Sequence, residues 1–536
     1  MMLATRAAAQ GSAAPRRSWL EATAGSEVEE YLRAIQLDST LARPYPQTIR
    51  AFGWREVARM QRATPAGPWA AAFDTLAPRR RIGAQLLRPA GALVFNTGFP
   101  FGMNDGPVCV GRGITSVVRA GAVVRAGPLT ARLEPIAFRA ENARFDLVNN
   151  GKTGDGRFRD ALEPFAIDQP QRFGSAPYQR IDLGESELRV DGLGVTAGLS
   201  NANEIWGPAV THPLILGANA AGFIHLFVGT AAPVPIFIGR VHVRLIAGRL
   251  EQSAYSPAPD SLAVRRATGI VASFQPRGLG GLELGGTRFF HRRWEGWSDL
   301  PGALTSPVDG LVFKRNRGGI DDPSSPAFLP DNQLASAFFR WPFPGAGFEF
   351  YGEFARNDAS VDLREFGTEP DHDSAYLLGF RRLAHRRDGR LLLVRGEWVN
   401  SRITHLARVR PQARFYQHGQ YVQGHTSRGE VLGSIDVMGG GGVSVGADLY
   451  DARGRSSLDL HRILRLTPLT EGAPDADHVD VQHAVVLSRS AFVRGMDVTA
   501  GLTGVWEMNR NFVRDAFNLG ATLGIRLGEG ARPAAR

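Results

Sequence analysis

Apolar and polar residues alternate along many segments of this chain, most clearly near the C-terminus. The alternating apolar positions there are Phe517, Leu519, Ala521, Leu523, Ile525 and Leu527, preceded by Met496, Val498, Ala500 and Leu502. The same alternation occurs at 348–354 and 118–124. A period of two places alternate residues on opposite faces of a strand. Runs of about 9–13 residues with one continuous apolar face predict the wall of a bilayer-spanning barrel, because soluble sandwiches use shorter strands.

The strand expected at 236–250 has the most contrasting faces. Its apolar residues Val241, Val243 and Leu245 alternate with Arg240, His242 and Arg244. We expect the apolar set to face lipid and the other set to face the lumen. The cations could line a lumen that attracts anions. Alternatively, they are paired inside the barrel with carboxylates such as Glu349 and Glu353.

The connections between these segments alternate between short and long. Asp191-Gly192 and Asp388-Gly389 favour two-residue hairpin turns, and Pro344-Gly345 and the glycines at 439–442 predict other tight links. Long polar segments lie at 141–177, 292–332, 358–373 and 403–426. Short turns at one end and long loops at the other are typical of an outer-membrane barrel, whose short turns lie in the periplasm.

The number of strands is constrained by closure of the barrel. Roughly 19 candidate strands can be counted, whereas a bacterial barrel made from one chain needs an even number. The short runs at 91–97 and 221–229 are the candidates to discard, which leaves about 18 strands. The sequence therefore predicts an all-β fold, a transmembrane antiparallel outer-membrane β-barrel, over residues 90–527.

Residues 20–85 have a helical pattern and predict a small periplasmic N-terminal part. Ser26 and Glu29 form a capping box, in which each side chain bonds to a free amide of the first turn. Segments 54–60 and 69–76 predict two further short helices. Residues 1–19 are expected to be disordered or the remnant of a leader, since they have no apolar stretch as long as that of a signal peptide. Residues 528–536 are expected to form a C-terminal tail.

Composition adds a strong positive charge to this picture. The 536 residues have a net charge of +10 and a pI of about 10.2. Nucleic acid would suit this charge, but the cations are scattered singly, mostly as Arg, without an RNA-binding aromatic motif. Acidic polysaccharide, lipopolysaccharide phosphate or a codon bias toward Arg would explain it equally. Cys109 is the single cysteine, which excludes an intramolecular disulfide.

Three regions contain candidate residues for binding polysaccharide. In segment 201–222, Trp206 begins a rigid aromatic turn and Asn219 offers an amide, and sugar rings with acidic groups need aromatic faces, amides and Arg forks. The alternative is a lumen plug in which the Trp is simply packed. The strand cations Arg240, His242 and Arg244 form the second region. Aromatic loop residues form the third, and these are Trp294, Tyr416, His418 and Tyr421. The loop residues could contact glycan or form the interfacial girdle at strand ends.

Patterns typical of catalysis or metal binding are weak. Glu204, His212 and His225 lack the helical spacing of a zinc site, and no GxSxG elbow is present. The glycine run at 278–286 continues as a strand, whereas a phosphate loop must open a helix. Asp155 and Asp160 lack the spacing of a calcium loop. We therefore expect no enzymatic activity, no metal and no cofactor.

Residues 204–255 contain a series of specific short elements: WGP at 206–208, PLILGANAAGF at 213–223, His225, GT at 229–230, PV at 233–234, IGR at 238–240 and AGRLEQSAY at 247–255. With these elements the stretch resembles the Wzi family of outer-membrane capsule-assembly proteins. Further similar stretches follow the expected order at 31–37, 332–356 and 416–433. The resemblance thus covers most of residues 25–527, and the combination is more specific than any single motif.

The resemblance implies an 18-stranded outer-membrane barrel with a periplasmic helical part, acting as a lectin that tethers capsular polysaccharide to the cell surface without catalysis. Two features depart from the family: the leader is missing, and GEGARPAAR follows the last strand where such barrels usually end in an aromatic residue. The implied partners are capsular or extracellular polysaccharide, outer-membrane lipid and lipopolysaccharide, and the barrel-assembly machinery. We expect a monomer that does not bind nucleic acid. The alternatives are a porin for small anionic or sugar solutes and an outer-membrane enzyme.

Overall fold

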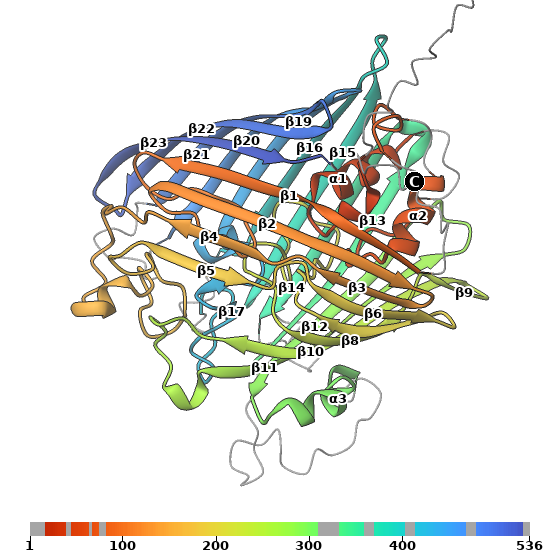
Figure 1. Cartoon of the computed structure of the whole chain (residues 1–536). Coiled ribbons are helices and arrows are strands. Elements are labelled where there is room, and N and C mark those ends of the chain that lie inside the picture. The colour runs from red at the N-terminus through yellow and green to blue at the C-terminus, as the bar shows by residue number, and fades with distance from the viewer. Residues whose placement is uncertain are drawn as a thin grey trace, which may run out of the picture.

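The chain forms a closed antiparallel β-barrel with a filled lumen (Figure 1). The computed structural model describes residues 17–38, 44–63, 67–73, 82–308, 332–357, 369–402, 413–467 and 479–528. Its main sheet contains 21 strand segments, and the first, β1, pairs with the last, β23. Three barrel strands consist of two consecutive segments each, β3 with β4, β5 with β6 and β8 with β9, so the 21 segments form 18 barrel strands. The predicted fold class is therefore confirmed.

The segments of the barrel wall are β1 (Ile82–Asn96), β2 (Gly113–Ala126), β3 (Leu129–Leu133), β4 (Ile136–Ala140), β5 (Tyr178–Asp182), β6 (Glu187–Gly192), β7 (Val195–Ser200), β8 (His225–Thr230), β9 (Val234–Ile236), β10 (Gly239–Glu251), β11 (Val264–Pro276), β12 (Glu283–Arg293), β13 (Asn332–Phe343), β14 (Phe348–Asn357), β15 (Ser374–His385), β16 (Leu391–Asn400), β19 (Gly441–Asp451), β20 (Gly454–Leu466), β21 (Asp480–Val493), β22 (Met496–Arg510) and β23 (Arg514–Arg526). The remaining elements are the hairpin strands β17 (Thr426–Ser427) and β18 (Glu430–Val431) and the helices α1 (Glu27–Ile35), α2 (Trp54–Ala63), α3 (Leu300–Ala303) and α6 (Ile435–Gly439).

The wall has the two faces that the alternation predicts. On β23 the side chains of Phe517, Leu519 and Leu523 are exposed, whereas Asn518 is buried against the lumen. On β10, His242 and Arg244 are buried in the lumen. An apolar outer belt and a polar interior are typical of barrels that span a bilayer. The described helices are all too short or too polar to cross a membrane.

The connections define two ends of the barrel. Short turns, for example those that follow β2, β6, β15 and β21, lie at one end, which we call the short-turn end, and the three-residue β22–β23 turn at the opposite end is an exception. The connections β1–β2, β4–β5, β7–β8 and β16–β19 are long and lie at the other, the long-loop end. Both the start of β1 and the end of β23 lie at the short-turn end, since Ala90 pairs with Arg526. The short–long alternation is thus confirmed.

Several local predictions are corrected by the structure. The turn expected at Asp191-Gly192 lies at Leu193-Gly194, with φ of 53° and 82°, because Gly192 still pairs with Val195 in the ladder. The glycines at 439–442 end α6 and begin β19 instead of joining two strands. Of the two runs that the strand count excludes, residues 91–96 belong to β1 and residues 225–229 belong to β8, whereas 221–224 lie in the connection before β8. The segment at 69–73 forms turns instead of a helix.

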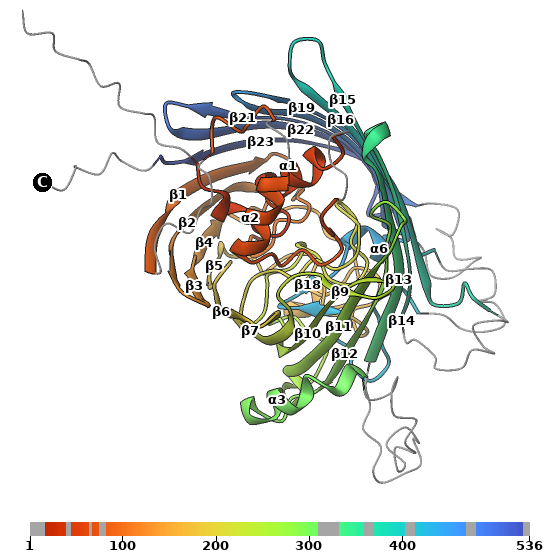
Figure 2. The ribbon, with the colours of Figure 1, turned by 90° about the vertical axis from the view of Figure 1, so that its right-hand side faces the viewer.

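Helices α1 and α2 lie inside the barrel ring near the short-turn end (Figure 2). Their apolar side chains pack with Leu383, Leu393 and Tyr450 of the wall. Upstream of α1, Glu21 pairs with Arg88 of β1 at 2.6 Å and with Arg526 of β23 at 2.7 Å, across the junction of the first and last strands. The N-terminal part therefore belongs to the filling of the lumen and is not a separate appendage. The rest of the predicted leader remnant (1–16) and most of the tail (529–536) fall outside the described residues.

Candidate functional site

The connection between β7 and β8, residues 201–224, folds into the lumen, and we call it the plug segment. Trp206 in this segment is fully buried and packs edge-on against Phe289 of β12, with ring centroids 6.3 Å apart. Gly269 on β11 leaves room for the indole, since a Cβ there would lie 2.7 Å from it. The residues around Trp206 thus form a packed core, and the plug alternative from the sequence is confirmed. Trp206 has no surface left for a ligand.

Glu204 connects the plug segment to the wall through a buried cluster. Its carboxylate lies 2.5 Å from a guanidinium nitrogen of Arg244 and 3.2 Å from Nε2 of His225, and it accepts a hydrogen bond from the indole of Trp206. Burial alone would raise the pKa of Glu204, but Arg244 and His225 outweigh it and lower the pKa to about 2. The expected internal pairing of Arg244 is confirmed, although its partner is Glu204 and not Glu349 or Glu353.

The tip of the plug segment is held by a carboxylate of the wall. Glu397 on β16 accepts hydrogen bonds from the backbone amides of Val210, Thr211 and His212, at 2.5 to 2.9 Å. It also accepts one from the hydroxyl of Tyr351 at 2.8 Å. Charge-assisted hydrogen bonds to a buried carboxylate are among the stronger ones in proteins. Hydrogen bonds to this carboxylate therefore fix the tip to the wall.

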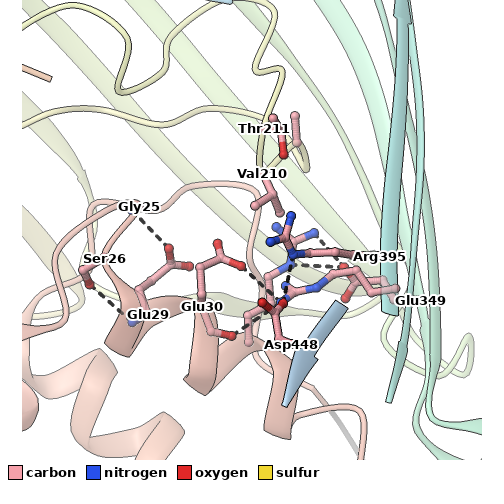
Figure 3. Close-up of polar contacts among 12 residues, drawn as sticks. Gly25, Ser26, Glu29, Glu30, Val210, Thr211, Glu349, Arg395 and Asp448 are labelled. Atoms are coloured by element: carbon pink, nitrogen blue, oxygen red, sulfur yellow. Dashed lines mark hydrogen bonds and ion pairs between the residues drawn. The ribbon is translucent and has the colours of Figure 1, made fainter. Parts of the chain in front are cut away.

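Helix α1 reaches the same tip from the short-turn side. Arg33 pairs with Glu349 of β14 at 2.6 Å and donates a hydrogen bond to the carbonyl of Pro208 at 2.8 Å. Figure 3 shows Glu29 and Glu30 of α1 beside Val210, Thr211 and the wall residues Glu349, Arg395 and Asp448. Half of the predicted capping box is present, because Ser26 accepts from the amide of Glu29, whereas the Glu29 carboxylate accepts from the amide of Gly25, the residue before the cap. Helix, plug and wall are thus joined by buried charges.

The other cations of β10 do not join the Glu204 cluster. His242 bonds to the hydroxyl of Thr230 at 2.6 Å and lies 3.9 Å from Glu56 of α2. Arg240 is exposed at the short-turn end and lines a pocket there with Arg59 of α2. The row Arg240, His242 and Arg244 is therefore divided among three environments, and it does not form a continuous anion-attracting surface.

The aromatic loop residues separate into two locations. Tyr416 is fully buried and donates a hydrogen bond to the carbonyl of Leu214 in the plug segment at 2.6 Å. Tyr421 is also buried, and His418 is half-buried beside it, with ring centroids 6.0 Å apart. Trp294 packs near α3 on the outer face of the wall, beside Leu226 and Ala247. Such a position at the end of a strand fits the girdle alternative better than a glycan contact.

A cleft among the long connections is the candidate binding site. Two adjoining cavities, of about 230 and 300 Å³, share Pro100, Gly102, Gln169, Pro170, Gln171 and Ile435 as lining residues, and we call them together the outer cleft. Further polar or aromatic side chains in its lining are Asn142, Phe145, Phe173, Tyr178, Asn219 and Gln482. Amide groups next to aromatic rings suit the hydroxyls and apolar faces of sugars. Of the residues that the sequence singled out for glycan binding, Asn219 lines this cleft.

Gln169 in the outer cleft has unused hydrogen-bonding capacity. Its carboxamide oxygen is buried and has no partner within the described residues. The neighbouring Gln171, by contrast, exchanges two hydrogen bonds with the backbone of Val148. A buried polar atom without a partner costs free energy unless a water or ligand satisfies it. Sequence reasoning missed Gln169, and the only sequence feature that points to it is a pair of amides around Pro170 in a long loop.

A buried serine, histidine and aspartate have the connectivity of a catalytic relay. His212 lies 2.5 Å from Asp436 of α6 and 2.8 Å from the hydroxyl of Ser444 on β19, which also bonds to His461. Burial lowers the pKa of His212, but Asp436 and Glu397 outweigh it, so that the pKa is raised. Ser444 is only 2% exposed, and neither Ser444 nor His212 lines any of the cavities described above. A nucleophile needs access to its substrate, and the buried position of Ser444 does not provide it.

Among the described residues, no three His, Cys, Asp or Glu side chains come together in a way that could hold a metal ion. Asp160 instead accepts hydrogen bonds from the amides of Leu162 and Glu163 and lies 3.4 Å from Arg414. Asp155 is exposed.

Comparisons with known proteins agree with this geometry. The family model described as "Capsule assembly protein Wzi" matches residues 115–447. Among solved structures, one of Escherichia coli is similar over 94% of this chain and 99% of its own, with a TM-score of 0.63 and 15% sequence identity. It is described as Wzi, an outer membrane protein involved in group 1 capsule assembly and a carbohydrate-binding β-barrel.

Other barrels are less similar. OccAB1 of Acinetobacter baumannii has a TM-score of 0.38 at 9% identity, and the alignment covers 84% of this chain and 97% of OccAB1. OccD3 of Pseudomonas aeruginosa has the same TM-score at 8% identity, with 84% and 94% covered. No curated protein sequence matches the chain significantly.

Proposed function

The chain belongs to the Wzi family of capsule assembly proteins, and we propose that it is an outer-membrane lectin that attaches capsular or extracellular polysaccharide to the cell surface. The observation that carries this proposal is the outer cleft at the long-loop end, with its amides, its aromatic rings and the unpartnered carboxamide oxygen of Gln169. In a bacterial barrel the long loops face the outside of the cell, where such polysaccharide lies.

The outer cleft offers hydrogen bonds more than charge. Most of its ionic side chains are already paired: Asp160 with Arg414, Glu430 with Arg180, and Arg465 with Asp480. What remains for a ligand is mainly the carboxamide oxygen of Gln169 and the ring faces, because the amide groups of Asn142 and Gln171 already bond within the protein. A stretch of sugar units rich in hydroxyl groups is therefore the ligand that the cleft suits best.

Substitution at Gln169 tests this proposal. The purified protein, in detergent micelles, would be incubated with an array of bacterial capsular and extracellular polysaccharides. We expect retention of at least one of them, and we expect Gln169→Ala to weaken it about tenfold, since one hydrogen bond inside a desolvated site contributes about 1–1.5 kcal/mol. Gln420→Ala, an exposed amide of the β16–β19 connection outside the cleft, is the matched control.

A porin is the alternative function. A steady open pore in planar bilayers, together with no retained polysaccharide, would replace the lectin proposal by a channel for small anionic or sugar solutes. The plug segment and the N-terminal part, which fill the lumen between them, favour the lectin.

We also propose that the protein acts without catalysis. The enclosed Ser444 supports this view. Measured turnover on polysaccharide, lipid A or phospholipid that is abolished by Ser444→Ala would contradict it.

The cellular setting follows from the same proposal. The short-turn end and the N-terminal part face the periplasm, and the barrel spans the outer membrane as a monomer. The barrel begins at Ile82 of β1 and not at the expected residue 90, so the N-terminal part ends before residue 82. Its outer belt contacts lipid and lipopolysaccharide, and the barrel-assembly machinery inserts it.

A further inference from the structure

The short-turn end of the barrel carries a one-sided charge. Eight exposed arginines lie there, on α2, on β10 and in four turns, and we call them the mouth arginines: Arg59, Arg62, Arg240, Arg277, Arg386, Arg387, Arg453 and Arg494. None of them forms an ion pair with a described residue. Asp388 is the one exposed carboxylate among the described residues of this end, and it is already paired with Arg390 at 2.5 Å.

The described part of the long-loop end has a mixed charge. Exposed acidic residues there, such as Glu141, Asp155 and Asp260, are interspersed with exposed arginines such as Arg144 and Arg293. Among the described residues, the exposed positive charge is therefore concentrated at one end, where it creates an attractive field for anions. A generally Arg-rich composition would have placed cations equally at both ends.

A pocket of about 390 Å³ lies among the mouth arginines, between α2 and the β9–β10 turn. Its lining contains two guanidinium groups, Arg59 and Arg240, and no carboxylate. Glu56, one turn before Met60 on α2, is unavailable to them, because it accepts a hydrogen bond from Tyr45 and pairs with Arg189. The other lining residues are Gln36, Pro44, Tyr45, Met60, Ala63, Pro233 and Pro235. The pocket thus combines two guanidinium groups without ion-pair partners, which can bind an anion, with an apolar wall.

We propose that this end is a docking surface for an acidic segment of a periplasmic protein, and that the pocket receives one of its carboxylates together with a neighbouring apolar side chain. The apolar wall favours a polypeptide over an acidic polysaccharide, which has carboxylates but few apolar groups. The position of the pocket argues against lipid headgroups. Arg240 lies on the face of β10 that also carries the lumenal His242 and Arg244, so the pocket opens toward the mouth and away from the bilayer.

The test measures binding of a labelled acidic peptide to the whole protein in detergent micelles. The probe is a fluorescein-labelled peptide of repeated Glu-Leu-Glu-Ser units, and fluorescence anisotropy is followed at low and at high salt. We expect the peptide to bind and its affinity to fall with rising salt concentration. The double variant Arg59→Gln with Arg240→Gln is expected to lower this affinity at least tenfold. The matched control, Arg144→Gln combined with Arg293→Gln, removes two exposed arginines from the opposite end and is expected to change affinity less than about twofold.

Three outcomes would overturn the proposal: no binding of the peptide, equal loss in both double variants, or tighter binding of polygalacturonate or of phosphatidylglycerol vesicles that depends on the same two arginines. Since all four substituted arginines are exposed, we expect the variants to fold like the wild type, which their migration in unheated gels checks. Polysaccharide retention through Gln169 is measured separately, so that a failure here leaves the lectin proposal standing.

Discussion

Among single residues, Glu204 makes the ion pair that connects the plug segment to Arg244 of the wall. Replacing it by Gln leaves Arg244 buried without its carboxylate partner, and removal of one member of a buried pair costs about 3–5 kcal/mol. We expect Glu204→Gln to lower the free energy of unfolding by this amount. The measurement is a urea titration of the protein in detergent micelles, followed by tryptophan fluorescence.

The control for this variant is an exposed ion pair. Asp146 pairs with Arg514, but their side chains are 76% and 73% exposed, so solvent already screens the interaction. Asp146→Asn should leave the unfolding midpoint unchanged. If the two variants lose equal stability, the Glu204 cluster does not anchor the plug.

The stability of the folded protein is expected to depend on pH through His425, which is buried in the lumen. Burial lowers its pKa to about 4, against an opposing hydrogen bond to the carbonyl of Ile215. The folded protein therefore favours the neutral ring. The stabilisation is fully present above the unfolded pKa of about 6.5 and is lost as the pH falls through 4.

We expect the urea midpoint to fall between pH 6.5 and pH 4, and His425→Gln to flatten this part of the profile. Below that range Glu204 acts in the same direction, because its contribution is present above pH 4.5 and is lost toward pH 2. Parallel profiles for wild type and His425→Gln between pH 6.5 and pH 4 would count against this assignment.

At the scale of elements, the plug segment and the N-terminal part form two barriers in series across the lumen. The first is fixed to the wall by Glu397, and the second is fixed by Glu21 and Arg33. We expect the wild type to show no steady current in planar bilayers. We also expect no steady current when residues 202–221 are replaced by a Gly-Ser linker or when residues 17–73 are deleted, because one barrier remains in each case.

The variant that combines both changes should conduct in discrete steps. Shortening the exposed stretch 149–157 of the β4–β5 connection, which lies outside the lumen, controls for the loss of chain. Steady current through the wild type would show that the two elements do not close the barrel.

The barrel strands were predictable from sequence because their signal is local. Each strand shows its own alternation, as in 517–527, and the wall simply repeats it. The plug segment could not be predicted in this way, since the partners of its tip, such as Glu397, are far away in the chain and follow no period. The turn after β6 shows the same limit, because Asp191-Gly192 has the preferred local chemistry, yet strand pairing up to Gly192 moves the turn to Leu193-Gly194. Gln169 could not be identified from sequence, because only the structure reveals that its buried carboxamide oxygen has no hydrogen-bond partner among the described residues.

The whole molecule has an orientation that labelling can test. In a Cys109→Ser background, a cysteine at Asp155 in the long β4–β5 connection should react with a membrane-impermeant maleimide on intact cells. A cysteine at Ala452, in the short β19–β20 turn, should react only after the outer membrane is permeabilised. Labelling of Ala452→Cys on intact cells would reverse the proposed orientation, and with it the assignment of the outer cleft to the cell surface.

The pairing of β1 with β23 also sets the order of events during assembly. Glu21 is among the first described residues to be synthesised, yet one of its two partners, Arg526, comes from the last strand. The N-terminal part therefore completes its contacts only when β23 is in place. Filling of the lumen at the short-turn end and closure of the barrel by β1–β23 pairing are thus completed in the same step. A chain that stops before β23 would have an unpaired edge on β1, and its Glu21 would lack one of its two arginine partners. An incomplete chain would therefore show two defects at the same junction, an unpaired β1 edge and a missing Glu21–Arg526 ion pair.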